Sequence, residues 1–187
     1  MEKYILEAAE IIRKGGVIIY PTDTILGLGC DATNSVAVQK IIAIKQRPAE
    51  KSFIVMVESD ARLNRHVQDI PSVAWDVLDV ADNPTTIVFD KGIGLAPEVL
   101  ASDGSVAVRL VKDSFCKQLI KKSNVPIVST SVNVSGENIP KDFYQIPKAI
   151  LDQVDYIVPL CFEKIQQNKP SSIIKIAGNG ETTVLRK

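Results

Sequence analysis

Short apolar runs alternate along this chain with segments of helical periodicity, and this alternation limits the folds open to it more than any other feature. Residues 16–20 (GVIIY), 53–57 (FIVMV), 85–89 (TTIVF) and 105–110 (SVAVRL) are typical of buried strands. Between such runs, apolar residues recur at helical spacing. The pattern predicts one α/β domain over residues 1–187, with a twisted mixed sheet of about seven strands and helices on both faces.

Helix boundaries are marked by capping residues and by proline. Asn34 or Ser35 can begin a helix, because such side chains accept hydrogen bonds from the first backbone N–H groups. Pro48 disfavours helical backbone angles at the residue before it, so this helix is expected to end near Lys45. Asp113 is expected to cap a later helix in the same way.

Composition and charge exclude several classes of protein. Hydrophobic residues make up 45% of the 187 residues, which indicates a globular chain. The 22 Lys and Arg residues balance the 22 Asp and Glu residues, so overall charge does not hold the protein on nucleic acid. No apolar run approaches the ~18 residues of a membrane span. We therefore expect a cytoplasmic protein with no membrane partner.

Cysteine and histidine offer little catalytic chemistry. Cys30, Cys116 and Cys161 lie far apart and form no C-x-x-C motif, so neither a disulfide framework nor a zinc site is expected. His66 is the only histidine and is predicted to be a surface side chain of a polar helix. Chemistry is therefore expected from Lys, Arg, Asp, Ser and Thr side chains and from the backbone.

The segment YPTDTILGLGCDA, residues 20–32, overlaps the end of the first apolar run. Gly27 and Gly29 match the dinucleotide-binding pattern G-x-G-x-x-A. However, residues 21–26 separate the strand from the first glycine, and no helix opens at the motif. We therefore reject a Rossmann site. Two interpretations remain: an ordinary surface turn, or a polar strand end where small residues let another group approach the backbone.

Three cations follow the expected helix end, in the segment Lys45-x-Arg47-Pro48-x-x-Lys51. They can complement the helix dipole, an interaction worth ~0.3–1 kcal/mol. Alternatively, the loop around Pro48 can direct Arg47 and Lys51 to one point, as the binding of polyphosphate requires.

Two later strands carry polar side chains that share a face. Ser105 and Arg109 alternate with valines, so both lie on one side of their strand. Arg109 is then either the partner of a buried acid or a receptor for a carboxylate. After the apolar run PIV, Ser129, Ser131 and Asn133 alternate in the same way, which indicates a polar site at that strand end.

Four segments in this order, YPTDTILGLGCDA, IKQRPAEKSFIVMV, SVAVRL and STSVNVSG, resemble the YrdC family of threonylcarbamoyl-AMP synthases. The resemblance implies a short, single-domain YrdC-like fold with an open substrate cavity. It implies a nucleotidyltransferase that condenses L-threonine, bicarbonate or CO₂, and ATP into threonylcarbamoyl-AMP and pyrophosphate, with Mg²⁺ accompanying ATP. The product would supply a tRNA-modifying transferase complex that forms threonylcarbamoyladenosine.

The same resemblance implies roles for individual residues, and none of them is expected to be a dedicated metal ligand. Lys45 and Arg47 are expected to be catalytic. The expected ATP contacts are Arg47, Lys51, Ser105, Ser131, Asn133 and Arg186. The expected threonine contacts are Thr24, Arg109, Ser129 and Ser172.

The chain departs from the family pattern at Leu26, where relatives often have Tyr, at Met56, where some longer relatives have His, and at residues 82–86, which replace a Trp-Pro-Gly-Pro-x-Thr segment. These departures concern the cavity wall and therefore amino-acid selectivity. Two alternatives stay open: a family member with another substrate, and a non-catalytic RNA-binding module, since the family has been linked to double-stranded RNA. Neutral charge and few aromatic residues disfavour RNA binding.

Overall fold

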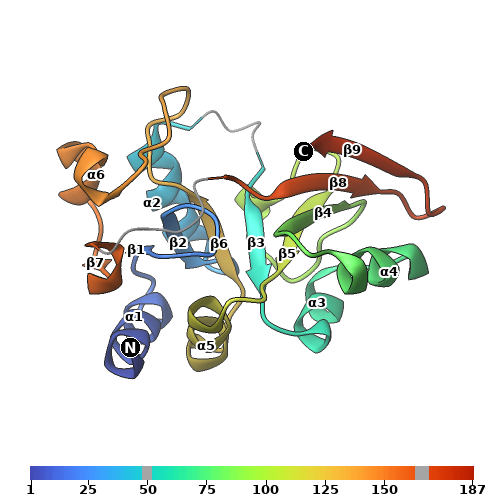
Figure 1. Ribbon diagram of the computed structural model, residues 1–187, viewed down its shortest axis with the longest axis horizontal. Coiled ribbons are helices and arrows are strands. Elements are labelled where there is room, and N and C mark those ends of the chain that lie inside the picture. Colours follow the sequence, from blue (N-terminus) through green and yellow to red (C-terminus); the bar gives the residue numbers. More distant parts are fainter. Residues whose placement is uncertain (48–51, 163–168) are drawn as a thin grey trace.

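The computed structural model describes residues 1–47, 52–162 and 169–187, and its centre is a nine-stranded sheet (Figure 1). The strands are β1 (Ile18–Tyr20), β2 (Gly27–Asp31), β3 (Ile54–Val57), β4 (Thr85–Phe89), β5 (Val106–Leu110), β6 (Ile127–Ser131), β7 (Tyr156–Ile157), β8 (Ser172–Ile176) and β9 (Thr182–Arg186). The α-helices are α1 (Glu2–Arg13), α2 (Ser35–Lys45), α3 (Asp60–His66), α4 (Ser72–Val80), α5 (Ser114–Ser123) and α6 (Lys148–Leu151). Short 3-10 helices are η1 (Pro97–Val99), η2 (Phe143–Gln145) and η3 (Pro159–Phe162).

The sheet is mixed, in the order β7-β1-β2-β6-β3-β5-β4-β8-β9. The pairs β1–β7, β3–β5 and β4–β8 are parallel, and the other pairs are antiparallel. In Figure 1, α1, α5, α3 and α4 lie below the sheet and α2 lies above it. The mixed α/β fold predicted from the sequence is therefore confirmed.

The strand count is nine rather than the predicted seven or so, and β2 explains part of the difference. Its sequence, GLGCD, carries two glycines, which weaken the signal of a strand interior. The strand nevertheless forms because both of its edges are paired, one with β1 and the other with β6. Tertiary pairing thus overrides local propensity in the segment that we expected to be a loop.

The two glycines of β2 make room for the ring of Tyr20. Gly27 is paired with Tyr20 in the sheet, and Gly29 is paired with Ile18. A Cβ atom on Gly27 would lie 3.0 Å from Tyr20 Cζ, and one on Gly29 would lie 2.7 Å from Tyr20 Cε1. The aromatic ring therefore lies across both glycines, fully buried, where any side chain on β2 would exclude it.

The predicted helix caps are confirmed. Asn34 accepts a hydrogen bond from the N–H of Ala37 at 3.1 Å, and Asp113 accepts one from the N–H of Cys116 at 2.8 Å. The first of these helices ends at Lys45, as expected. One expectation was wrong: His66 is buried rather than exposed, and its Nδ1 lies 3.2 Å from the carbonyl oxygen of Ile93.

Replacing Gly29 with alanine should destabilise the protein. The added Cβ would lie 2.5 Å from the carbonyl oxygen of Val128, which is backbone of a paired strand, so the sheet would have to move. Overpacking of this kind costs about 1–3 kcal/mol, which chemical denaturation would detect. Gly178→Ala is the matched control, because its Cβ would meet Asp90 Oδ2 at an ordinary 3.5 Å. Equal stability of the two variants would contradict this account of β2.

Candidate active site

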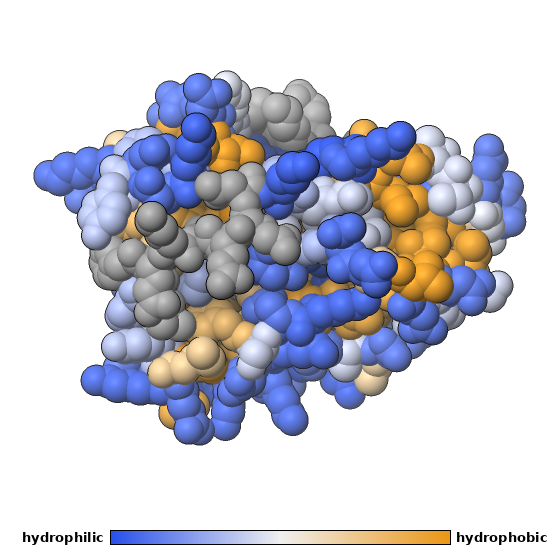
Figure 2. Space-filling model, viewed as in Figure 1, coloured by the Kyte–Doolittle hydropathy of each residue, from blue (hydrophilic) through white to orange (hydrophobic). Residues whose placement is uncertain are grey.

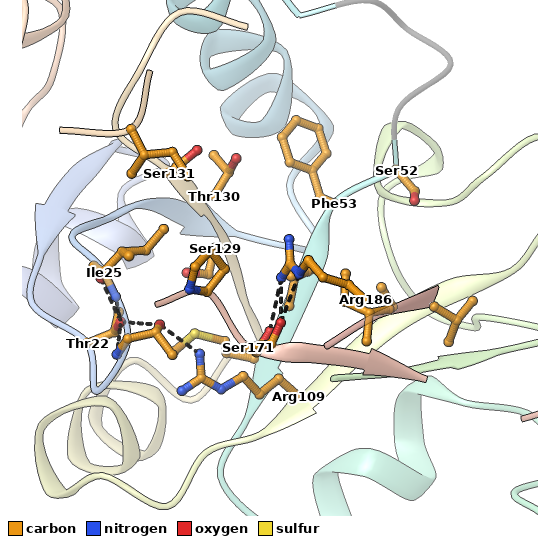
Figure 3. Close-up of a pocket in the computed structure, with 18 of the residues that line it drawn as sticks. Thr22, Ile25, Ser52, Phe53, Arg109, Ser129, Thr130, Ser131, Ser171 and Arg186 are labelled. Carbon is orange, nitrogen blue, oxygen red and sulfur yellow. Dashed lines mark hydrogen bonds between the residues drawn. The ribbon is translucent and has the colours of Figure 1, made fainter. Parts of the chain in front are cut away.

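A cavity of about 380 Å³ opens on one face of the central strands (Figure 3). Ile54 and Met56 of β3, Ala107 and Arg109 of β5, and Ser129 of β6 contribute its floor. These residues are two apart along each strand and therefore point to the same face of the sheet. The end of β1 leads into a loop that forms one wall, and β8 and β9 contribute another.

Hydrogen bonds between neighbours shape the loop after β1. Thr22 Oγ1 accepts from the backbone N–H groups of Thr24 and Ile25, at 3.1 and 3.2 Å, and lies 2.6 Å from the carbonyl oxygen of Ile25. The hydroxyl of Thr22 also lies 2.9 Å from that of Thr24. Thr22, Thr24 and Ile25 all line the cavity. The loop is therefore a folded part of the site and not an ordinary surface turn.

Arg109 is the buried charge of this end of the cavity and is 5% exposed. Its Nη1 donates a hydrogen bond to Thr24 Oγ1 at 3.1 Å, and its Nη2 forms an ion pair with Asp23. Burial raises the pKa of Asp113 nearby, and the carboxylate of Asp23 adds to this effect. Of the two interpretations of Arg109, the structure shows the partner of an acid, while the side chain still lines the cavity where a carboxylate could approach.

A second, small hollow of about 60 Å³ meets Arg109 from the side of Asp23. Asp82, Asn83, Pro84 and Thr85, which replace the family's Trp-Pro-Gly-Pro-x-Thr segment, line this hollow. They do not line the main cavity among the described residues. Met56, another departure, does lie in the wall of the main cavity, whereas Leu26 is buried in the core.

Two further arginines, Arg47 and Arg186, line the cavity. Figure 3 shows Arg186 beside Ser171, and it shows Phe53 and Ser52, the partners of Arg47, on the side away from Thr22. The guanidinium carbon of Arg47 lies 4.5 Å from the centre of the Phe53 ring, and its Nη2 donates to the carbonyl oxygen of Ser52 at 2.6 Å. Arg186 donates from Nε and Nη2 to the carbonyl oxygen of Ser171, at 2.9 and 2.7 Å. These contacts fix the positions of the guanidinium groups of Arg47 and Arg186 in the cavity wall.

The rim of the cavity on β9 is apolar. Leu185 lines the cavity and is 56% exposed, and its neighbour Val184 is 55% exposed. Figure 2 shows apolar surface gathered toward the β8–β9 end of the sheet on the same face of the molecule. The cavity thus combines buried or anchored charges with an open apolar edge.

Lys45 lies beneath the cavity wall and is 1% exposed. Its Nζ donates to the carbonyl oxygens of Ser131 and Asn133, at 2.5 and 2.6 Å, and lies 3.3 Å from Asn133 Oδ1. Ser131 Oγ donates to the same Oδ1 at 2.5 Å, and the N–H of Ser135 donates to the carbonyl oxygen of Lys45 at 2.9 Å. Lys45 therefore ties the end of α2 to the strand end that carries Ser131.

The structure brings together six of the residues proposed from the sequence. Those that line the cavity are Thr24, Arg47, Arg109, Ser129, Ser131 and Arg186. Lys51 lies outside the described residues. Those placed outside the lining are Lys45, Asn133, Ser105 and Ser172.

Ser105 and Ser172 have other partners. The backbone N–H of Ser105 donates to Asp103 Oδ1 at 2.9 Å, just before β5. The N–H of Ser172 donates to the carbonyl oxygen of Pro84 at 3.0 Å. Ser171 and Ile173 line the cavity, and Ser172 between them does not. Two adjacent serines differ in the face that they present, and a sequence alone does not say which one points inward.

Several lining residues were not proposed from the sequence, among them Thr22, Phe53 and Ser171. Thr22 belongs to the segment PTDT, and its spacing of two from Thr24 was an available signal. Phe53 was read as part of a buried strand, and its contact with Arg47 depends on the fold. The pairing of Asp23 with Arg109 joins residues 86 positions apart and has no local signal.

Within the described ranges, no group of three or more His, Cys, Asp and Glu side chains is arranged to hold a metal ion. The same ranges contain no helix with the length and apolar character that crossing a membrane requires. The cysteines are buried and unpaired, and burial raises the pKa of Cys161 to about 12. None of the three is therefore a ready thiolate nucleophile.

Comparison with known proteins places this fold and cavity in one family. The family model of Sua5/YciO/YrdC, described as "Telomere recombination", matches residues 10–187. A threonylcarbamoyl-AMP synthase of Pseudoalteromonas translucida (strain TAC 125) is 33% identical over 180 residues, which are 95% of this chain and 95% of that protein. The threonylcarbamoyl-AMP synthase of Hydrogenovibrio crunogenus (strain DSM 25203 / XCL-2) is 38% identical over 136 residues, which are 70% and 73% of the two chains. The chain belongs to the Sua5/YciO/YrdC family.

Solved structures of proteins named YciO and Sua5 have the same fold as this chain. E. coli YciO superposes with a TM-score of 0.85 at 26% identity, covering 100% of this chain and 90% of that chain. P. abyssi Sua5 complexed with L-threonine superposes with a TM-score of 0.85 at 25% identity, covering 100% of this chain and 54% of that chain. The chain thus spans about half of that Sua5. The fold class and the family predicted from the sequence are confirmed.

The buried position of Lys45 predicts a pH dependence of stability. Burial, reinforced by the charge of Arg47, lowers the pKa of Lys45 to about 8, below the value of about 10.4 for an unfolded chain. Between these values the unfolded state binds more protons than the folded state, so stability rises with pH. The free energy of unfolding should therefore increase across pH 8–10 relative to a Lys45→Met variant, by up to about 1.4 kcal/mol per pH unit.

Chemical denaturation of both proteins at pH 7, 8, 9 and 10 measures this difference. Lys121→Met, at an exposed position of α5, is the matched control and should show no such slope. A constant difference between wild type and Lys45→Met would mean that Lys45 stays charged throughout this range.

Proposed function

We propose that this chain is an L-threonylcarbamoyl-AMP synthase, a nucleotidyltransferase that joins L-threonine, bicarbonate or CO₂, and the AMP part of ATP. The observation that carries the proposal is the arrangement of one cavity with two kinds of receptor. Buried Arg109 contacts the hydroxyl of Thr24 on one side of the cavity, and Ser129 lines the cavity as well. Arg47, held against Phe53, and Arg186, held at Ser171, line the cavity away from the Thr22 loop. The names of the curated relatives and the threonine complex of P. abyssi Sua5 support the same assignment.

The Arg109 end suits a small zwitterion with a hydroxyl group. A guanidinium binds a carboxylate through charge-assisted hydrogen bonds, and burial strengthens that interaction. The hydroxyls of Thr24 and Ser129 add neutral donors and acceptors beside it. We therefore assign this end to L-threonine, with its carboxylate at Arg109.

The Arg47 end suits the polyphosphate of a nucleotide. Arg47 and Arg186 are held by contacts to Phe53 and Ser171, so their positive charges are positioned before a ligand arrives. The apolar rim at Leu185 offers contact area to a flat base. A volume of about 380 Å³ lies within the usual range of about 300–1,000 Å³ for pockets that bind small molecules.

Two bonds form in the proposed reaction. The neutral amine of threonine attacks the carbon of CO₂ and releases a proton to give a carbamate. With bicarbonate, the amine proton instead leaves together with a hydroxide as water. A carbamate oxygen then attacks the α-phosphorus of ATP, and the bond to the leaving pyrophosphate breaks. No covalent enzyme intermediate is needed, so the site can act by positioning and by stabilising charge at Arg47 and Arg186.

The described lining residues supply arginines and hydroxyls but no carboxylate set for Mg²⁺. A Mg²⁺ ion that enters with ATP would be held by phosphate oxygens and water, as this ion commonly is. The buried, unpaired cysteines fit a reducing compartment, and we place the protein in the cytoplasm. There the adenylate would pass to an enzyme complex that modifies tRNA.

Turnover with purified protein tests the proposed function. Pyrophosphate should be released from ATP and Mg²⁺ only when L-threonine and bicarbonate are both present, and threonylcarbamoyl-AMP should be found by mass spectrometry. No RNA should be required. Arg47→Ala, at the phosphate end, should lose most of this activity, while Arg65→Ala, at an exposed position of α3, should keep it.

Several results would contradict the assignment. Pyrophosphate release without threonine would indicate another acceptor. An absence of turnover combined with tight binding of double-stranded RNA would favour the RNA-binding alternative. Equal activity of Arg47→Ala and wild type would remove Arg47 from the site.

A further inference from the structure

The hydroxyl of Thr22 lies in the loop after β1, and the proposed chemistry gives it no role. Its Oγ1 lies 2.6 Å from the carbonyl oxygen of Ile25. A carbonyl oxygen carries no proton, so only Thr22 can supply the one that holds two oxygen atoms at this distance. The proton of Thr22 is therefore committed to the backbone.

The backbone that follows Thr22 fixes the position of its hydroxyl. The N–H groups of Thr24 and Ile25 donate to Thr22 Oγ1 at 3.1 and 3.2 Å. A threonine hydroxyl that bonds backbone groups two and three residues ahead forms a local turn. Rotation of the Thr22 side chain would break all three of these bonds to the backbone, so the direction of its proton is fixed as well.

The hydroxyl of Thr24 contacts both Thr22 and Arg109. Thr24 Oγ1 lies 2.9 Å from Thr22 Oγ1, a distance at which either oxygen could be the donor. Because the proton of Thr22 is already held by Ile25, the donor in this contact is Thr24. Arg109 Nη1 in turn donates to Thr24 Oγ1 at 3.1 Å. The resulting chain of hydrogen bonds from Ile25 to Arg109 can be followed in Figure 3.

These contacts decide what Thr24 can offer to a ligand. A hydroxyl has one proton and two lone pairs, so Thr24 retains one lone pair after it has donated to Thr22 and accepted from Arg109. Thr24 lines the cavity, where a ligand beside Arg109 therefore meets an acceptor and not a donor. In an α-amino acid, the amino group is attached to the carbon next to the carboxylate. A carboxylate bound at Arg109 thus brings its amino group near the Thr24 hydroxyl.

We propose that Thr22 is a positioning residue that makes the Thr24 hydroxyl an acceptor for the amino group of the substrate. The inference rests on the proposed function, because it assumes an amino acid whose carboxylate lies at Arg109. Thr24 then holds the amine through one of its N–H bonds. Because the proton of Thr24 points to Thr22, it forms no hydrogen bond with the lone pair through which the neutral amine attacks CO₂.

Two ligands that differ only at the α-carbon test the proposal. L-2-Aminobutyrate carries an amino group that donates, and 2-oxobutyrate carries a keto oxygen that only accepts. Calorimetric titration gives the Kd of each ligand for wild type and for Thr22→Val, which keeps the side-chain shape and releases the proton of Thr24. The ratio of the Kd of 2-oxobutyrate to that of L-2-aminobutyrate should fall by about 2- to 12-fold in this variant, the range of one ordinary hydrogen bond. Thr22→Ser keeps the hydroxyl and should keep the wild-type ratio.

Thr33→Val is the matched control. It removes a hydroxyl that donates to Asp31 Oδ1 at 2.8 Å in the loop after β2, outside the described cavity lining, and it should leave the ratio unchanged. Thr24→Val is a second test, which remains informative if Thr22→Val does not fold. Loss of an acceptor weakens the binding of the amino acid and not that of the oxo acid, so the ratio should fall here too.

Three results would overturn the proposal while the proposed function stands. A folded Thr22→Val that binds both ligands more weakly by the same factor would show that Thr22 only shapes the loop. An unchanged ratio in Thr22→Val would show that Thr22 does not determine the direction of the Thr24 proton. A higher ratio in Thr24→Val would show that Thr24 donates to the ligand. Wild-type protein that binds neither L-threonine nor L-2-aminobutyrate would instead overturn the proposed function, and the role of Thr22 with it.

Discussion

The buried guanidinium of Arg109 is the interaction on which the site depends. A charge that is 5% exposed is costly unless it is paired, and Asp23 and Thr24 provide its partners from the loop after β1. The pairing joins β5 to a loop that lies 86 residues earlier in the chain. It therefore fixes the loop against the sheet and at the same time presents a positive charge at the wall of the cavity. The same side chain, Arg109, therefore stabilises the loop and offers a positive charge to a ligand.

Two other contacts hold the remaining walls in a comparable way. Lys45 joins the end of α2 to the carbonyl oxygens around Ser131, and Ser171 holds the guanidinium of Arg186 on β9. In each case one polar group that lines the cavity is fixed by a contact to another strand or helix. A site that binds by positioning requires such support, because a small displacement of a charged group weakens its interaction with a ligand. The cavity is thus built largely from groups that are oriented before any ligand enters.

The fold class, two helix caps and several residues of the site could be predicted from the sequence. The α/β class followed from alternating apolar runs, and the caps at Asn34 and Asp113 followed from local chemistry. Arg109 and Ser129 were found because polar residues at the ends of apolar strands are conspicuous. In contrast, β2 was not predicted because its two glycines have a low propensity for strands. Which of Ser171 and Ser172 points into the cavity depends on the register of β8, and a shift of one residue would exchange them. The ion pair of Arg109 with Asp23 depends on tertiary structure alone.

The central claim is that one cavity has an amino-acid end at Arg109 and a phosphate end at Arg47. Calorimetric titration of Arg109→Lys and Arg47→Lys, separately with L-threonine and with ATP, tests it most directly, since lysine keeps the charge but loses the planar fork. Arg109→Lys should weaken threonine binding by roughly 10-fold or more, about 1.4 kcal/mol, and leave ATP binding nearly unchanged. Arg47→Lys should show the opposite pattern. Loss of ATP binding in Arg109→Lys with threonine binding intact would contradict the claim.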